Sequence, residues 1–128
     1  MFQLDLKSRK TIYEQVVDNF KELIISEVLK PEEKLPSVRE LSKMLTVNPN
    51  TIQKAYRELE YQGYVYTVSG LGTFVAVPKK SQINPSAVEK IYEKIKGDLK
   101  ELYFLGLSKE EIKAGIDKLL EERGDFND

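Results

Sequence analysis

Residues 35–63 read LPSVRELSKMLTVNPNTIQKAYRELEYQG, and this stretch contains two helix-start signals in close succession. Ser37 and Glu40 form the capping-box pattern, in which each side chain can bond the backbone N–H of the other residue. Asn48 is a favourable N-cap, and Pro49 suits the first helical position because its missing N–H would be unpaired there anyway. The stretch therefore predicts two helices joined by a tight turn.

The two predicted helices differ in length. The first is expected to end near Leu45 or Thr46, with Leu41 and Leu45 facing inward. The second is expected to run to about Gln62, where Gly63 supplies the left-handed conformation that ends a helix. Its inward face is predicted from apolar side chains at helical spacing, namely Ile52, Ala55, Tyr56 and Leu59.

The flanking sequence adds a hairpin and a further helix. Residues 64–68 and 73–77 are rich in strand-forming side chains, and the Gly-containing loop SGLG, residues 69–72, separates them. Upstream, residues 2–6 alternate between apolar and polar and predict a short strand. An apolar stripe predicts an amphipathic helix over residues 11–28, formed by Ile12, Val16, Phe20, Leu23, Ile24 and Val28.

A short helix, a turn, a longer helix and a hairpin together make the winged helix-turn-helix pattern. The second helix of such a unit enters the major groove of DNA with its first turn, where Asn and Gln can pair with adenine and Lys and Thr can bind phosphate or guanine. Each candidate taken alone also has a purely structural explanation, since Asn48 can serve only as a cap. The candidate DNA-binding residues are Arg39, Asn48, Pro49, Asn50, Thr51, Gln53, Lys54, Ser69, Gly70, Gly72 and Thr73.

Charge is distributed unevenly although the net charge is only −1. From Lys34 to Arg57 there are five basic side chains and one acidic side chain, whereas from Ser81 onward eight basic side chains face eleven acidic ones. A basic centre attracts the phosphate backbone of DNA. The same excess could also belong to an ordinary solvated surface, so charge alone does not decide between the two interpretations.

The residues that are missing argue against enzymes and metal proteins. The chain contains neither Cys nor His, which removes thiolate chemistry, disulfides, the commonest general base and the commonest metal ligand. We find no catalytic or phosphate-binding motif, and we expect neither an enzyme nor a bound cofactor or metal. No apolar run approaches the length of a membrane span, so we expect a cytoplasmic protein without a membrane partner.

The C-terminal region predicts two helices that need a partner. A cap signal at residues 84–86 opens the first, Gly106 closes it, and Ser108 with Glu111 opens the second. Two helices with one apolar stripe each cannot enclose a core, so we expect them to pack against a second copy. The alternative is that they fold back on their own chain. The predicted dimer residues are Val88, Ile91, Tyr92, Ile95, Leu99, Leu102, Ile112, Ile116 and Leu119.

Three segments also resemble a known family: LPSVREL at 35–41, VNPNTIQKAYRELE at 47–60, and Gly63 followed by GTFV at 72–75. They are similar to the GntR family of bacterial and archaeal regulators, and the NPNT turn and short C-terminal region resemble its YtrA-like branch. The resemblance implies a winged helix with a dimerisation segment and a repressor that releases its operator on a signal. It also implies DNA contacts from Arg39, from residues 48–54 and from the wing tip.

The sequence departs from the family pattern in two places. The wing tip, residues 69–72, lacks the Arg or Lys that is often found there, which places a charged wing contact in doubt. The loop around Glu27 and Glu32 lacks the usual glycines, so a different backbone path is expected before Lys34.

The sequence thus predicts a mostly helical α+β protein that regulates transcription. We expect a winged helix-turn-helix over residues 1–78, a linker over 79–84 and a helical dimerisation segment over 85–128. Its expected partners are double-stranded DNA and a second copy of itself, and its expected action is repression from a palindromic operator. A small-molecule effector stays open, although the short C-terminal region leaves little room for a ligand pocket. A protein-binding winged helix and a non-specific DNA binder are the alternatives.

Overall fold

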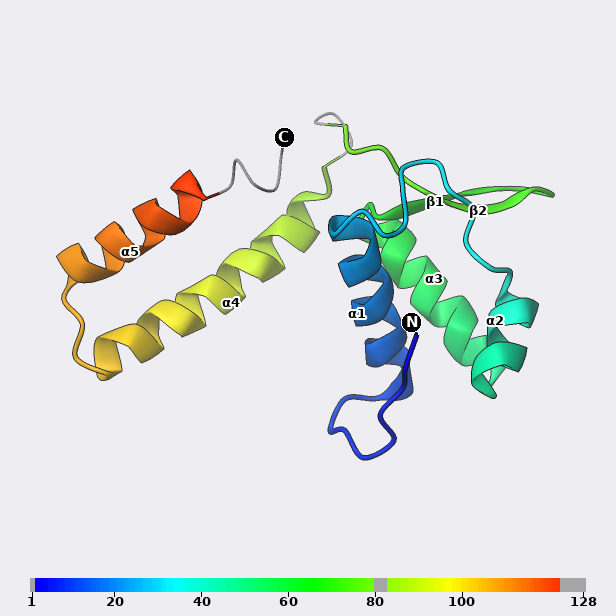
Figure 1. Ribbon diagram of the computed structural model, residues 1–128, viewed down its shortest axis with the longest axis horizontal. Helices are drawn as coiled ribbons and strands as arrows, with labels where there is room; N and C mark the ends of the chain where they lie inside the picture. The colour runs from blue at the N-terminus through cyan, green and yellow to red at the C-terminus, as the bar shows by residue number, and fades with distance from the viewer. Residues whose placement is uncertain (1, 80–82, 123–128) are drawn as a thin grey trace. The chain divides into compact units, whose positions relative to one another are not determined.

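The computed structural model describes residues 2–79 and 83–122, and the chain divides into two compact units, Met1–Asn84 and Pro85–Asp128. The first unit contains α1 (Ile12–Ile25), α2 (Val38–Leu45), α3 (Pro49–Tyr61) and an antiparallel hairpin of β1 (Val65–Val68) and β2 (Gly72–Val75) (Figure 1). The second contains α4 (Pro85–Phe104) and α5 (Lys109–Glu121). The predicted fold class, a mostly helical α+β chain with an N-terminal winged helix-turn-helix, is confirmed. Among the described residues, none of the helices has the length and apolar character that crossing a membrane requires.

The core of the first unit lies where α1 and α2 pack against α3. Val16, Leu41 and Ile52 are each at most 1% exposed, and the predicted inward face of α3 is buried in full. Phe20 of α1 meets Tyr56 of α3 edge to face, with ring centroids 5.6 Å apart. The Tyr56 hydroxyl donates a 2.7 Å hydrogen bond to the Pro36 carbonyl oxygen, which ties α3 to the residue before the cap of α2. This core fixes α3 relative to the other two helices.

The helix starts predicted from sequence are confirmed. The Ser37 side chain accepts a bond from the Glu40 N–H, and the Glu40 carboxylate accepts one from the Ser37 N–H at 2.9 Å. Asn48 caps α3, and Pro49 occupies its first turn. Gly63 has φ of 90°, a conformation that costs glycine far less than any other residue. The helix-turn-helix therefore begins and ends where local chemistry predicts.

The strand predicted over residues 2–6 is wrong. This segment forms no strand; the Phe2 ring packs on Phe20 at 5.1 Å, and the Asp5 N–H donates to Gln15 Oε1 at 2.7 Å. Alternating polarity produces a strand only when a neighbouring strand accepts its hydrogen bonds. Here the side chains of α1 provide the contacts instead.

The end of α1 also differs from the prediction. The helix stops at Ile25, and Glu27 adopts a left-handed φ of 61°. The chain then reverses, so that the Leu29 N–H donates to the Leu23 carbonyl oxygen at 3.0 Å. Leu29 is buried, and Val28, which was expected to extend the apolar stripe, is 54% exposed. This loop lacks the glycines that are common in the resembling family, and Glu27 and Glu32 adopt the left-handed conformation in it.

The second strand of the wing is shorter than predicted, and the segment before α2 forms hydrogen bonds with it. β2 begins at Gly72 and ends at Val75, one residue earlier at its start and two earlier at its end than expected. The segment before α2 runs beside it: the Leu35 N–H donates to the Thr73 carbonyl oxygen and the Val75 N–H to the Glu33 carbonyl oxygen, both at 2.8 Å (Figure 1). Lys34 forms an antiparallel bridge with Phe74. Residues 32–35, predicted in part as loop, therefore lie along β2 through these bonds and one isolated bridge, although the sheet itself has only two strands among the described residues.

The expected linker and chain end lie partly outside the described residues. Residues 80–82 of the predicted linker and residues 123–128 of the predicted C-terminal segment are outside the described residues. α4 begins at Pro85, as the cap signal predicts, and the Ser108–Glu111 capping box opens α5.

Candidate nucleic-acid interface

The first turn of α3 presents polar side chains on a rigid base. Asn48 Oδ1 accepts the Asn50 N–H at 2.8 Å, so the Asn48 side chain satisfies the helix end. Asn50, Gln53 and Lys54 are exposed, whereas Thr51 is half-buried. Because Ile52 and Ala55 of the same helix are fully buried, the backbone that carries these polar side chains is fixed on the core. Such an arrangement suits contacts with base edges in the major groove of DNA.

Arg39 lies on the exposed side of the first turn of α2. The carboxylate beside it, Glu40, is occupied by the capping box, and hydrogen bonds to Ser37 lower the pKa of Glu40. Within residues 2–79 and 83–122, the one ion pair joins Lys10 and Asp18 at 2.6 Å. The Arg39 guanidinium is therefore not neutralised by a carboxylate in the described part of the chain, and it is available for an external anion.

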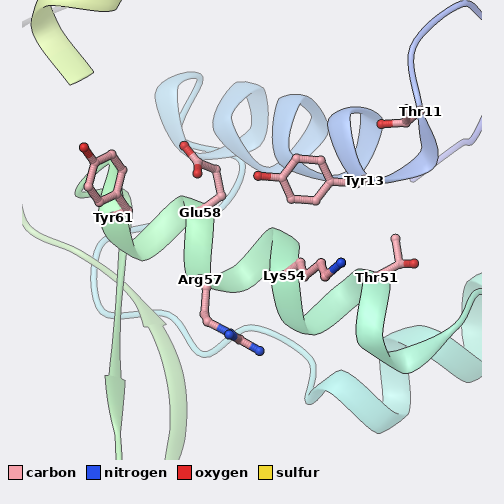
Figure 2. A pocket seen from close by; sticks show the side chains of 7 residues that line it. All are labelled: Thr11, Tyr13, Thr51, Lys54, Arg57, Glu58 and Tyr61. Carbon is pink, nitrogen blue, oxygen red and sulfur yellow. The ribbon is translucent and has the colours of Figure 1, made fainter. Parts of the chain in front are cut away.

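An open groove of about 710 Å³ runs along the outer side of α3, between this helix and the start of α1. Figure 2 shows Tyr13 and Glu58 facing each other across it. Partial burial, followed by the charge of Glu58, raises the pKa of Tyr13. The groove is lined by Thr11, Tyr13, Thr51, Lys54, Arg57, Glu58 and Tyr61. It continues the surface of the first turn of α3 with three further hydroxyl groups, those of Thr11, Tyr13 and Tyr61, and with the cation Arg57.

The groove was not predicted from sequence. The sequence places Lys54 and Arg57 in a basic stretch, but Tyr13 and Thr11 are far from them in the chain. Only the packing of α1 on α3 brings the four together.

The wing tip exposes backbone, small side chains and the side chain of Leu71. Ser69 and Gly70 are exposed, whereas Gly72 and Thr73 are half-buried. The Leu71 N–H donates to the Val68 carbonyl oxygen at 3.0 Å and closes the turn, leaving the Leu71 side chain 64% exposed. The structure thus places the predicted contacts in two groups, α2 with α3, and the hairpin.

Comparison with known proteins agrees with this geometry. Residues 12–75 match the model of the gntR family of bacterial regulatory proteins. The chain is 36% identical over 119 residues to the HTH-type transcriptional repressor YtrA of Bacillus subtilis, covering 93% of this chain and 92% of that protein. The chain belongs to the GntR family. Its similarity to YtrA extends over the C-terminal helices, so the predicted YtrA-like relationship is confirmed.

Solved structures support the same assignment for this GntR protein. YtrA from Sulfolobus acidocaldarius, a GntR-family transcription factor, has a TM-score of 0.69 at 32% identity and covers 94% of this chain and 97% of its own. The DNA-binding domain of AraR, solved in complex with operator ORX1, has a TM-score of 0.51 at 36% identity over 59% of this chain and 93% of that chain. As a GntR member, the chain is a DNA-binding regulator of transcription.

The second unit of this GntR chain is poorly buried by itself. α4 contains no buried residue, and α5 contains one, Ile112. Of the predicted dimer residues, Leu99 and Leu102 are half-buried, and six are exposed: Val88, Ile91, Tyr92, Ile95, Ile116 and Leu119. Ile112 is 6% exposed in the single chain, so it has little surface left for a partner.

Proposed function

We propose that this protein is a cytoplasmic repressor that binds a palindromic operator as a homodimer. The observation that carries the proposal is the exposed first turn of α3, where Asn50, Gln53 and Lys54 project from a buried base. We assign base reading to Asn50 and Gln53, which have the amides that pair with adenine edges. The protein acts by binding and not by catalysis.

The remaining candidate residues hold the DNA backbone in this proposal. Arg39 and Lys54 neutralise phosphates, and Thr51 and Thr73 offer hydroxyl groups. The N-terminus of α3 adds the favourable end of its dipole, with Asn48 and Pro49 shaping that turn. At the wing tip, Ser69, Gly70 and Gly72 bring backbone close to the duplex.

Exposed apolar surface in the second unit supports the homodimer. Tyr92 is 65% and Leu119 is 63% exposed, and both lie on helices with almost no buried residues. Helices of this kind are stabilised when their apolar faces pack against a partner, and a two-fold partner of the same chain is the commonest arrangement. A two-fold protein matches an operator whose two half-sites are inverted repeats.

Selection of bound sequences from a random duplex pool, carried out at two salt concentrations, tests the proposal. We expect an enriched palindrome, with affinity that falls steeply as salt rises. Salt-sensitive binding without enrichment would indicate a non-specific DNA binder. No binding at low salt would indicate a winged helix that binds protein.

A further inference from the structure

The wing tip contains no basic residue, but a lysine from another segment of the chain lies against the wing. No Arg or Lys occurs among residues 69–72, but Lys34 lies against the hairpin from the segment before α2. A Cβ placed on Gly72 would lie 2.8 Å from Lys34 Cε and 3.6 Å from Lys34 Nζ. The lysine side chain therefore crosses the face of β2 at the one position where no side chain obstructs it.

Strand register explains why Lys34 points this way. Lys34 is bridged to Phe74, and side chains two residues apart on a strand share a face, so Gly72 and Phe74 lie on the same side. The next residue, Leu35, is 2% exposed and faces the core, which leaves the outer face to Lys34. The Phe74 ring stacks on the Tyr66 ring, with centroids 5.6 Å apart, and this contact stabilises the face.

No carboxylate forms an ion pair with Lys34 in the described part of the chain. Hydrogen bonds to Ser37 are the main reason for the lowered pKa of Glu40, and the charge of Lys34 lowers it a little further. Lys34 is thus near the first turn of α2 as well as the wing. Arg39 belongs to that same first turn of α2.

We propose that Lys34 binds a DNA phosphate and supplies the positive charge of the wing. The inference rests on the proposed DNA-binding function and extends it to a residue outside the first turn of α3 and outside the wing tip, residues 69–72. A lysine ammonium is a compact, rotatable donor that contacts phosphate without reading bases. Lys34 therefore contributes affinity and salt dependence but no sequence preference.

The test measures affinity of the full chain for its selected duplex at several salt concentrations. Lys34→Ala is expected to weaken binding by roughly fivefold to tenfold per chain and to reduce the salt slope by about 1 per chain, equally on selected and random duplexes. Lys34→Arg retains most of both. Lys30→Ala is the matched control, because Lys30 is an exposed lysine of the same connection that makes no bridge to the hairpin.

A second variant checks the geometry. Gly72→Ala adds the Cβ that displaces Lys34, and it also strains the backbone, because Gly72 has φ of 133°. The backbone strain is present in both backgrounds, so the part of the affinity loss that disappears in the Lys34→Ala background measures the contact between Lys34 and DNA. Thermal unfolding of each variant shows whether the wing stays folded. Additive effects of the two changes on affinity would contradict a contact made across Gly72.

These outcomes distinguish failure of DNA binding from failure of the Lys34 contact alone. If the wild-type protein binds no duplex, the proposed function fails and the inference fails with it. If the wild-type protein binds but Lys34→Ala keeps the wild-type salt slope, the inference alone fails. A loss of stability with an unchanged slope would show that Lys34 only protects the edge of the wing, and that also overturns the inference.

Discussion

At the scale of single residues, neighbouring polar side chains in α3 have separable tasks. Asn48 accepts a backbone hydrogen bond from Asn50, whereas the Asn50 side chain is exposed beside it. The sequence predicted both residues as DNA contacts and gave Asn48 a second interpretation, as the cap of the helix. Only the geometry distinguishes a side chain that completes the helix from one that is available to a ligand.

Substituting Asn48 should mainly lower stability, whereas substituting Asn50 should mainly lower DNA affinity. Asn48→Ala removes the cap and should lower the free energy of unfolding by about 1 kcal/mol. Asn50→Ala leaves that bond intact, since its own backbone donates it, and should weaken DNA binding by roughly 10- to 100-fold. Chemical denaturation and duplex titration measure the two effects. An Asn50→Ala protein with wild-type affinity would exclude this turn from base reading.

Arg39→Ala should weaken DNA binding about tenfold and should lower the salt slope by about 1 per chain, because one phosphate contact is lost. Lys43→Ala, which removes an exposed cation from the last turn of the same helix, serves as the control. Both proteins should keep the wild-type oligomeric state in sedimentation. Equal salt slopes for the two variants would remove Arg39 from the interface.

At the scale of elements, the sequence predicted best what depends on nearby residues. The boundaries of α2 and α3 follow from Ser37, Asn48 and Gly63, which act on their own backbone. The pairing of Lys34 with β2 and the groove along α3 depend on residues far apart in the chain, so no local pattern indicated them. The predicted strand over residues 2–6 failed for the same reason, because alternation does not reveal whether a partner strand exists.

The capping boxes give the described helices an acid sensitivity. Backbone hydrogen bonds from Thr11, Ser37 and Ser108, respectively, are the main cause of lowered pKa values at Glu14, Glu40 and Glu111, whose ordinary pKa is 4.5. A carboxylate with a lowered pKa stabilises the fold fully above its ordinary pKa, and it loses that effect as pH falls through the lowered value. Stability should therefore decline below about pH 4.5.

Replacing the three capping carboxylates with Gln should flatten this decline. Gln can complete a capping box but does not titrate in this range. The measurement is Tm from pH 7 to pH 3 for the triple variant and for Glu22→Gln, a control on the exposed face of α1. An unchanged acid profile in the triple variant would show that other carboxylates dominate.

At the scale of the whole molecule, the two units differ in how well they are buried. The first has a continuous core that includes Val16, Leu41 and Leu59, whereas α4 has no buried residue. Periodicity placed the apolar side chains of α4 and α5 in one stripe on each helix. It could not show that Ile112 would be covered within the single chain while Ile95 would stay 41% exposed.

Ile95→Asp should therefore convert the proposed dimer to monomers, because it places a charge in the apolar stripe of α4. Lys100→Asp introduces the same side chain on the polar side of that helix and should leave the dimer intact. Analytical ultracentrifugation compares the two at equal concentration. An unchanged dimer in Ile95→Asp would place the interface elsewhere.

The sparse burial of the second unit has a consequence for gene control. If a second copy covers those helices, the amount of operator-binding species at low expression rises with the square of the chain concentration. A twofold change in synthesis or degradation then alters operator occupancy by up to fourfold. The same two helices would thus give the promoter a threshold, set by how many copies of the chain a cell contains.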